Sequence, residues 1–129
     1  MLIDKELLDG VSVRAQVSER LRMNFNLHDS LDAKAQRLLN ALEPGTLLPI
    51  HRHRHTSETY ILLRGRIDVM FYDDNRTVTE HFELDPVQGR YGVHIPKNQW
   101  HTLTVLEPAV IFEVKDGPYA PLAAGDIME

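Results

Sequence analysis

From residue 36 onward, the sequence alternates apolar and polar residues in short segments, and turn-forming residues separate these segments. Such alternation predicts β-strands, because successive side chains of a strand point to opposite faces of a sheet. Turn signals include Glu107-Pro108, and Gly65 is expected to form a hairpin turn. The expected strands are 36–43, 47–53, 58–64, 66–73, 77–84, 91–95, 100–106 and 109–115. Many short strands with polar connections predict a mainly β protein, built as a sandwich or a barrel.

The N-terminal part of the chain has a different pattern. Residues 4–20 carry apolar residues near helical spacing, and Asp4 is suited to cap the start of a helix. The segment 22–27 alternates and predicts a further strand. A length of 129 residues fits one domain. We expect residues 1–35 to form a helix and an arm that pack on a barrel formed by residues 36–129.

Four potential metal ligands lie in one short stretch and one later strand. His51 and His53 are two residues apart, so on a strand their imidazoles point to the same side. Glu58 follows a short polar turn at 54–57 and can bring a carboxylate to the same point, and His101 lies on a later predicted strand. Imidazole and carboxylate together are a natural ligand set for a transition metal.

Two segments of the chain resemble the sequence motifs of the cupin superfamily. The segment Gly45–Gly65 has the form G-x5-H-x-H-x4-E-x6-G and resembles the first motif. The segment Gly89–His101 resembles the second motif, G-x5-P-x-G-x2-H-x3-N. It departs from the motif in that six residues, not five, separate Gly89 from Pro96, and Asn98 stands where the motif has its second glycine. The resemblance implies a single cupin domain, which is a double-stranded β-helix or jelly-roll barrel, and makes His101 the fourth ligand.

A resemblance to the WbuC-type cupin-fold metalloproteins covers nearly the whole chain. These are small bacterial proteins, some of them encoded among polysaccharide biosynthesis genes. The similar stretches, beside the HxH motif, are Arg22–Ser30, Gln36–Leu42 and Glu113–Tyr119. This resemblance strengthens the expectation of a metal-binding cupin and adds little about the substrate.

The ligand set narrows the choice of metal without settling it. The chain has no cysteine, so nitrogen and oxygen must hold any ion. The candidates are divalent Fe, Mn, Zn or Ni, and imidazole suits several of them equally. An ion with five or six ligands would keep open positions for a substrate, as catalytic sites do. His55 continues the alternation of His51 and His53 but falls in the predicted turn, and its part in the site stays open.

Other polar residues are candidates for catalysis or substrate binding. Tyr60 has the same strand parity as Glu58, and we consider it, together with His28, a candidate for proton transfer. A buried structural tyrosine is the alternative for Tyr60. The candidates for a substrate pocket are Arg22, Asn24, Asn26, Arg37 and Glu113. A solvated strand face would show the same pattern, so that alternative also stays open.

The net charge and the N-terminal sequence limit the partners and the location that we expect for the protein. A net charge of −5 gives no reason to expect nucleic acid or an anionic membrane as a partner. The N-terminus lacks the features of a secretory signal, and no apolar run approaches the roughly 20 residues of a membrane span. We therefore expect a cytoplasmic protein that binds a small molecule, and cupins commonly form homodimers.

The function that these features favour is metal-dependent catalysis on a small, polar, carbohydrate-derived substrate. The chemistry would be isomerisation or epimerisation, or activation of water. Two alternatives stay open. One is an Fe(II)-dependent dioxygenase, since three histidines and a glutamate resemble the ligands of several cupin dioxygenases. The other is a cupin that binds a small molecule without catalysis.

Overall fold

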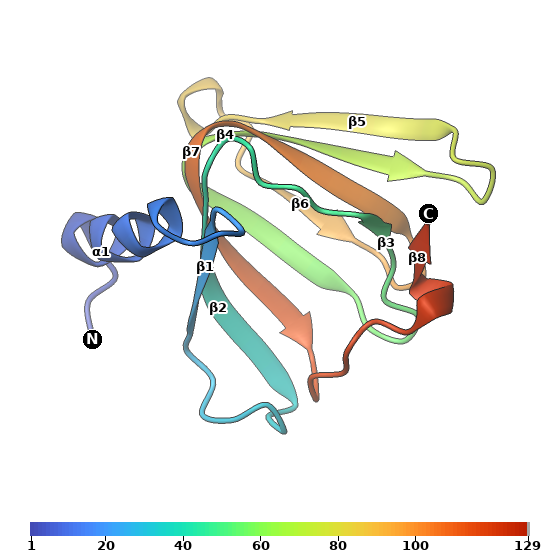
Figure 1. Cartoon of the computed structure of the whole chain (residues 1–129), viewed down its shortest axis with the longest axis horizontal. Coiled ribbons are helices and arrows are strands. Elements are labelled where there is room, and N and C mark those ends of the chain that lie inside the picture. The colour runs from blue at the N-terminus through green and yellow to red at the C-terminus, as the bar shows by residue number, and fades with distance from the viewer. Residues whose placement is uncertain (129) are drawn as a thin grey trace.

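The computed structural model describes residues 1–128 as an N-terminal helix followed by two layers of strands (Figure 1). The helix α1 spans Lys5–Gln16. The strands are β1 (Arg22–Asn26), β2 (Ala35–Leu42), β3 (Ile50–His51), β4 (Glu58–Tyr72), β5 (Val78–Leu84), β6 (Gly92–Ile95), β7 (Trp100–Asp116) and β8 (Ile127–Met128). Two short 3-10 helices are η1 (Pro86–Gln88) and η2 (Ala124–Asp126). The mainly β architecture with one short N-terminal helix, predicted from the sequence, is confirmed.

The two long strands, β4 and β7, belong to both layers. The second half of β7 pairs with β2 and with the first half of β4, which gives the antiparallel order β1-β2-β7-β4-β6. The first half of β7 pairs with β3 and with the second half of β4, which gives the order β8-β3-β7-β4-β5. In Figure 1, β5 marks one layer and β2 the other, with α1 outside both. The shared strands join the two layers into one jelly-roll barrel.

Two of the turns predicted from the sequence are bends inside continuous strands. β4 runs through Gly65, and β7 runs through Pro108. The pairing of β4 with β7 shifts in register between Leu62 and Ile67, which is the sign of β-bulges. Gly65 has a φ of 89°, and a Cβ there would collide with the carbonyl oxygen of Pro108. The prediction of a hairpin turn at Gly65 was therefore wrong, because glycine marks bulges as well as turns.

The strand predicted at 47–53 is much shorter in the structure. β3 contains only Ile50 and His51, and it pairs with β7 on one side and β8 on the other. Pro49 directly precedes β3 and has no backbone N–H to contribute to a ladder. After His51 the chain leaves the strand ladder and curves toward the start of β4, and its backbone bonds to Asp126 and Asn98 instead.

The main core fills the space between the layers, and a second apolar cluster lies under α1. The main core combines inward side chains of β2, β4, β5, β6 and β7, with Ile67, Val69 and Ile111 at most 1% exposed. The helix packs Leu8, Val11 and Ala15 against the outer face of β2 and β7. Burial of these side chains, at roughly 25 cal/mol per Å² of apolar surface, holds the helix on the barrel.

Polar contacts fix the position of α1 on the barrel. Asp4 caps the helix by accepting a hydrogen bond from the Leu7 N–H at 3.0 Å, as the sequence predicts. Arg64 on β4 donates to Asp9 at 2.6 Å and to Ser12 at 2.8 Å. Across residues 1–128, no helix combines the length and the apolar character that crossing a bilayer requires.

The segment before residue 36 contributes a strand as well as the helix. β1 pairs with β2 from Arg22 opposite Leu42 to Asn26 opposite Leu38. Met23 and Phe25 pack outward with the cluster under α1, so Arg22, Asn24 and Asn26 face the inside of the barrel. The part expected as an arm thus completes one edge of the barrel.

Candidate metal centre and its cavity

His51, His53, Glu58 and His101 come together at one point where the two layers meet. A potential ligand atom from each lies within 4.8 Å of the others. His51 ends β3 and stands directly opposite His101 on β7, while Glu58 begins β4. His53 lies in the curved segment between β3 and β4. The shortness of β3 matters here, because it lets His53 turn toward Glu58.

Hydrogen bonds orient two of the imidazoles. The Nδ1 atom of His51 lies 2.9 Å from the carbonyl oxygen of Pro49, and Nδ1 of His101 lies 2.9 Å from that of Gln99. A carbonyl oxygen can only accept, so each Nδ1 carries the proton. The Nε2 lone pair of each ring then remains for an ion, which is the usual arrangement of a histidine that binds metal.

The buried polar atoms of the site fit a cation. Nε2 of His101 lies 2.9 Å from Oε1 of Glu58, and Nε2 of His53 lies 3.5 Å from the same oxygen. Despite these short distances, both Glu58 oxygens and Nε2 of His101 lack a hydrogen bond of acceptable geometry within the described chain. A bare imidazole nitrogen and a carboxylate oxygen repel each other unless a proton or a cation lies between them. The convergence of two further imidazoles favours the cation.

The electrostatics of the site keep the imidazoles neutral. Burial lowers the pKa of His51 to about 4, and the neighbouring His101 adds to this effect. Burial lowers the pKa of His53 to about 3 and also lowers the pKa of His101. Neutral imidazole is the form that binds a metal ion. The histidines are therefore ready to bind an ion at neutral pH without losing a proton.

Two carboxyl groups lie side by side next to the cluster. Glu113 on β7 stands opposite Tyr60 on β4, one inward position from Glu58. Burial, together with the negative charge of Glu58, raises the pKa of Glu113 to about 8. Burial also raises the pKa of Glu58, while Lys115 opposes this rise. Both shifts favour a proton on this pair of carboxyl groups beside the ligand cluster.

A cavity of about 600 Å³ opens onto the cluster. His51, His53 and Glu58 lie in its lining, and His101 is buried behind them, at 2% exposed. The structure also places six other predicted residues in the lining: Arg22, Asn24, Asn26, His28, Tyr60 and Glu113. Their roles in catalysis or substrate binding remain predictions. The volume is that of a typical small-molecule site.

Arg37 and His55 are the two predicted residues that lie outside the cavity and the cluster. Arg37 is exposed, because Gln36 and Leu38 on either side of it point inward and line the cavity. The expectation of Arg37 in the pocket is therefore corrected. His55 is also exposed and does not belong to the group of converging ligands.

The sequence analysis did not single out Asn40 or Arg20, which also line the cavity. Lys115, which the sequence suggests as a pocket residue together with Glu113 on the last predicted strand, lines it too. Asn40 has the same strand parity as Leu38 and Leu42, so it is a polar residue between two apolar ones in the inward row of β2. That break in the row was the signal available in the sequence. Lys115 stands opposite Glu58, and only the pairing of β4 with β7 brings the two together.

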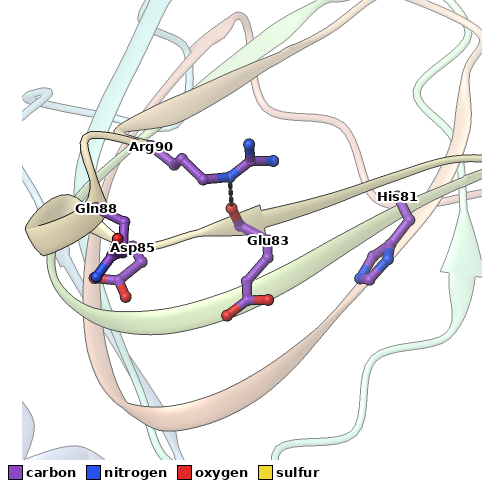
Figure 2. A pocket seen from close by; sticks show the side chains of 5 residues that line it. All are labelled: His81, Glu83, Asp85, Gln88 and Arg90. Atoms are coloured by element: carbon purple, nitrogen blue, oxygen red, sulfur yellow. Dashed lines mark hydrogen bonds between the residues drawn. The ribbon is translucent and has the colours of Figure 1, made fainter.

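A second hollow, of about 480 Å³, lies on β5 and the segment after it (Figure 2). Its side chains are His81, Glu83, Asp85, Gln88 and Arg90. The charges at this hollow pair with neighbours, since Arg66 binds Glu83 at 3.1 Å and His81 lies 3.2 Å from Asp68. We interpret it as an ion-paired strand surface, separate from the metal ligands.

Comparison with protein families shows that the chain belongs to the family described as Domain of unknown function (DUF6016), whose model matches residues 3–84. A comparison with curated proteins finds no match. The matched region includes α1, β1 to β5 and the ligands His51, His53 and Glu58, but it ends before His101.

Similar solved structures show the cupin fold. The capsular polysaccharide assembling protein CapF from Staphylococcus aureus matches with a TM-score of 0.67 and 18% identity, over 81% of this chain and 30% of CapF. KdgF from Halomonas sp. matches with a TM-score of 0.62 and 15% identity, over 81% of this chain and 85% of KdgF. The Cnp3 cupin domain from Schizosaccharomyces pombe matches with a TM-score of 0.60 and 11% identity, over 76% and 66% of the two chains. The chain spans about a third of the length of CapF. The cupin barrel predicted from the sequence is confirmed.

Proposed function

We propose that the protein is a metal-dependent enzyme that acts on a small, polar, carbohydrate-derived substrate. The observation that carries the proposal is the convergence of three neutral imidazoles and one carboxylate at a cavity whose lining includes other polar side chains, such as Arg22, Asn24 and Asn40. Four protein ligands leave positions open if the ion takes five or six ligands. Fe, Mn, Zn and Ni in the divalent state all suit this ligand set.

The residues around the ligands suit proton transfer. A bound divalent ion would supply Lewis acidity toward a carbonyl or hydroxyl oxygen of the substrate. Glu113 and Tyr60 stand opposite each other beside Glu58, and both line the cavity. In an isomerisation or epimerisation, one base removes a proton from the carbon next to a carbonyl, and the proton returns to a neighbouring position or to the other face. We assign this exchange to Glu113, with Tyr60 and His28 as the further candidates.

The link to carbohydrates rests on two resemblances. The sequence resembles the WbuC-type cupins, some of which are encoded among polysaccharide biosynthesis genes, and CapF is described as a capsular polysaccharide assembling protein. CapF shares the fold at 18% identity, so it supports this proposal only in a general way. The polar side chains among the lining residues, such as Asn24, Asn26 and Asn40, are consistent with a hydroxylated ligand.

An Fe(II)-dependent dioxygenase is the second candidate, because three histidines and one glutamate also suit Fe(II) and leave room for oxygen. Chelator-treated protein, reloaded separately with Fe(II), Mn(II), Zn(II) or Ni(II), would distinguish the two reactions. Aldose and ketose phosphates in D₂O are followed by ¹H NMR, and oxygen uptake is measured in parallel. We expect metal-dependent deuterium incorporation next to the carbonyl without oxygen uptake.

The controls are His51→Ala, which removes a ligand, and His55→Ala, which changes an exposed histidine outside the cluster. Activity that His51→Ala retains in full would contradict a metal-dependent reaction. Oxygen uptake by the Fe(II)-loaded protein, and not by the protein loaded with the other metals, would favour the dioxygenase. Tight binding of a sugar without turnover under any metal would favour a binding protein.

A further inference from the structure

One wall of the cavity has polar side chains that do not belong to the metal ligands. We call this the β1–β2 wall, and it consists of Arg22, Asn24, Asn26, His28 and Asn40, all of which line the cavity. Asn24 and Asn40 stand directly opposite each other on β1 and β2. The wall is on different strands from the four metal ligands, which come from β3, β4, β7 and the segment after β3.

His28 presents one buried nitrogen to the cavity. The side chain is 8% exposed, and its Nδ1 lies 3.1 Å from the Arg37 backbone nitrogen and 3.0 Å from the Arg37 carbonyl oxygen. These contacts fix the ring, whereas Nε2 is buried and has no hydrogen-bond partner among residues 1–128. A buried polar atom without a partner is unfavourable, and a ligand that bonds to it recovers that loss.

Asn40 presents a second atom of the same kind. Its Oδ1 is buried and also lacks a hydrogen-bond partner within the described chain. Asn40 lies three residues along β2 from Arg37, to which His28 is bonded, so the backbone positions that carry the two side chains are spaced by about 10 Å along the strand, at 3.3 Å per residue. A single hydroxyl group cannot reach both atoms. A ligand that satisfies both must be elongated, with polar groups near each of its ends.

The cavity has an excess of cationic side chains. Arg20, Arg22 and Lys115 line the cavity, and none of them forms an ion pair in the part of the chain that the structure describes. Only two acidic residues line the cavity, and one of them, Glu58, faces the other ligands. Free cations gather here although the whole protein has a net charge of −5. Such an excess favours an anionic ligand, and guanidinium suits carboxylate and phosphate equally.

From these observations we infer that the β1–β2 wall is a recognition subsite for an elongated, hydroxylated anion, with Arg22 at its carboxylate or phosphate group and with His28 and Asn40 at its hydroxyl groups. A hydroxyl group both donates and accepts, so it pairs with Asn40 Oδ1 and with His28 Nε2 in either tautomer. The inference rests on the proposed function, because it places the reacting end of the ligand at the metal ligands. It assigns Asn40 a role that the sequence did not suggest.

Binding measurements on the metal-loaded protein test the subsite independently of turnover. Four probes separate the chemistries: glucose 6-phosphate has hydroxyls and phosphate, gluconate has hydroxyls and carboxylate, glucose is neutral, and inorganic phosphate has no carbon-bound hydroxyls. Isothermal titration calorimetry should show that glucose 6-phosphate or gluconate binds at least tenfold more tightly than glucose and than phosphate. Whichever of the two binds more tightly identifies the anionic group.

Three variants and one matched control locate the contacts. Arg22→Gln should lower the affinity for the charged probes about tenfold or more and leave the affinity for glucose unchanged. Arg37→Gln, on the outward face of β2, should change neither affinity. Asn40→Leu and His28→Gln should lower the affinity for glucose 6-phosphate and gluconate and leave the affinity for inorganic phosphate unchanged. Circular dichroism and thermal melting confirm that each variant folds before its affinity is compared.

The outcomes that overturn the subsite differ from those that overturn the proposed function. Three outcomes would each refute the subsite. The first is an equal effect of Arg22→Gln and Arg37→Gln on binding, and the second is equal affinity for glucose and glucose 6-phosphate. The third is no binding of any probe at a concentration of about 10 mM. Loss of all metal binding or of all turnover, with the probe preferences intact, would refute the proposed function and leave the subsite standing. The probe preferences should therefore persist in part in His51→Ala.

Discussion

Nε2 of His101 lies 2.9 Å from Oε1 of Glu58, and the two side chains are only 2% and 1% exposed. His101 belongs to the layer that contains β3, and Glu58 belongs to the layer that contains β6. The candidate metal centre therefore bridges the two layers of the barrel. An ion at this point would act on stability as well as on chemistry, because it would link β3, β4 and β7 through side chains in addition to their backbone pairing.

Removal of one ligand should release the metal and leave the barrel folded. We expect His51→Ala to reduce the metal content at least tenfold, since one of four ligands is lost and the core between the layers does not depend on it. His55→Ala should keep the metal content of the wild type. Elemental analysis of both purified variants, with circular dichroism as the check on folding, measures this. Full occupancy in His51→Ala would show that His51 is not a ligand.

Metal binding should stabilise the fold. A ligand present at 100 times its dissociation constant stabilises the native state by about 2.7 kcal/mol, so the melting temperature of chelator-treated protein should rise by several degrees when metal is added. Glu58→Gln keeps the shape of the side chain but removes its charge, and it should abolish most of this rise. A melting temperature that does not respond to metal in the wild type would contradict an ion between the layers.

The stability of the metal-free protein should depend on pH through Glu113. The pKa of this carboxyl group is about 8 in the folded chain and near 4.5 when unfolded, so the folded state binds the extra proton between these values. Its contribution is fully present below pH 4.5 and is lost as the pH rises toward 8. Glu113→Gln should therefore gain stability over the wild type by a few kcal/mol at pH 8.5 but not at pH 4.5, since each tenfold change in proton affinity is about 1.4 kcal/mol.

Urea unfolding of both proteins at the two pH values, with chelator present, measures this difference. The change in Glu113→Gln relative to the wild type isolates Glu113 from the histidines, which titrate in both proteins. An equal stability difference at both pH values would mean that Glu113 is not held protonated in the folded chain.

The bend in β4 should require glycine. At Gly65, alanine would need a φ of 89° and its Cβ would meet the Pro108 carbonyl, so Gly65→Ala should cost roughly 2–4 kcal/mol of stability. At Gly89, φ is 76° but a Cβ meets no atom within 4 Å, so Gly89→Ala should cost only about 1 kcal/mol. Gly10→Ala, inside α1 with open space around it, should stabilise by about 1 kcal/mol. Chemical denaturation ranks the three, and a reversed order of Gly65→Ala and Gly89→Ala would contradict the role of the bulge.

The sequence alone determined the features that depend on short stretches of chain. The alternation of side chains predicted a β barrel, the spacing of apolar residues after Asp4 predicted α1, and the HxH pattern with Glu58 gathered three ligands from one stretch of eight residues, 51–58. Local spacing sets the direction of each side chain, because the periods of strand and helix are fixed by the backbone.

Only the tertiary structure decided the features that depend on which strands pair. Turn-forming residues at Gly65 and Pro108 did not reveal whether the chain reverses or bends, and the pairing of β4 with β7 makes both positions bends. Parity placed Arg37 and Asn40 on opposite faces of one strand, but the position of β2 between β1 and β7 determined that Asn40 faces the cavity and Arg37 the solvent. Lys115 meets Glu58, and His101 meets His51, for the same reason: long-range pairing brings together residues whose separation in the chain carries no information about their contact.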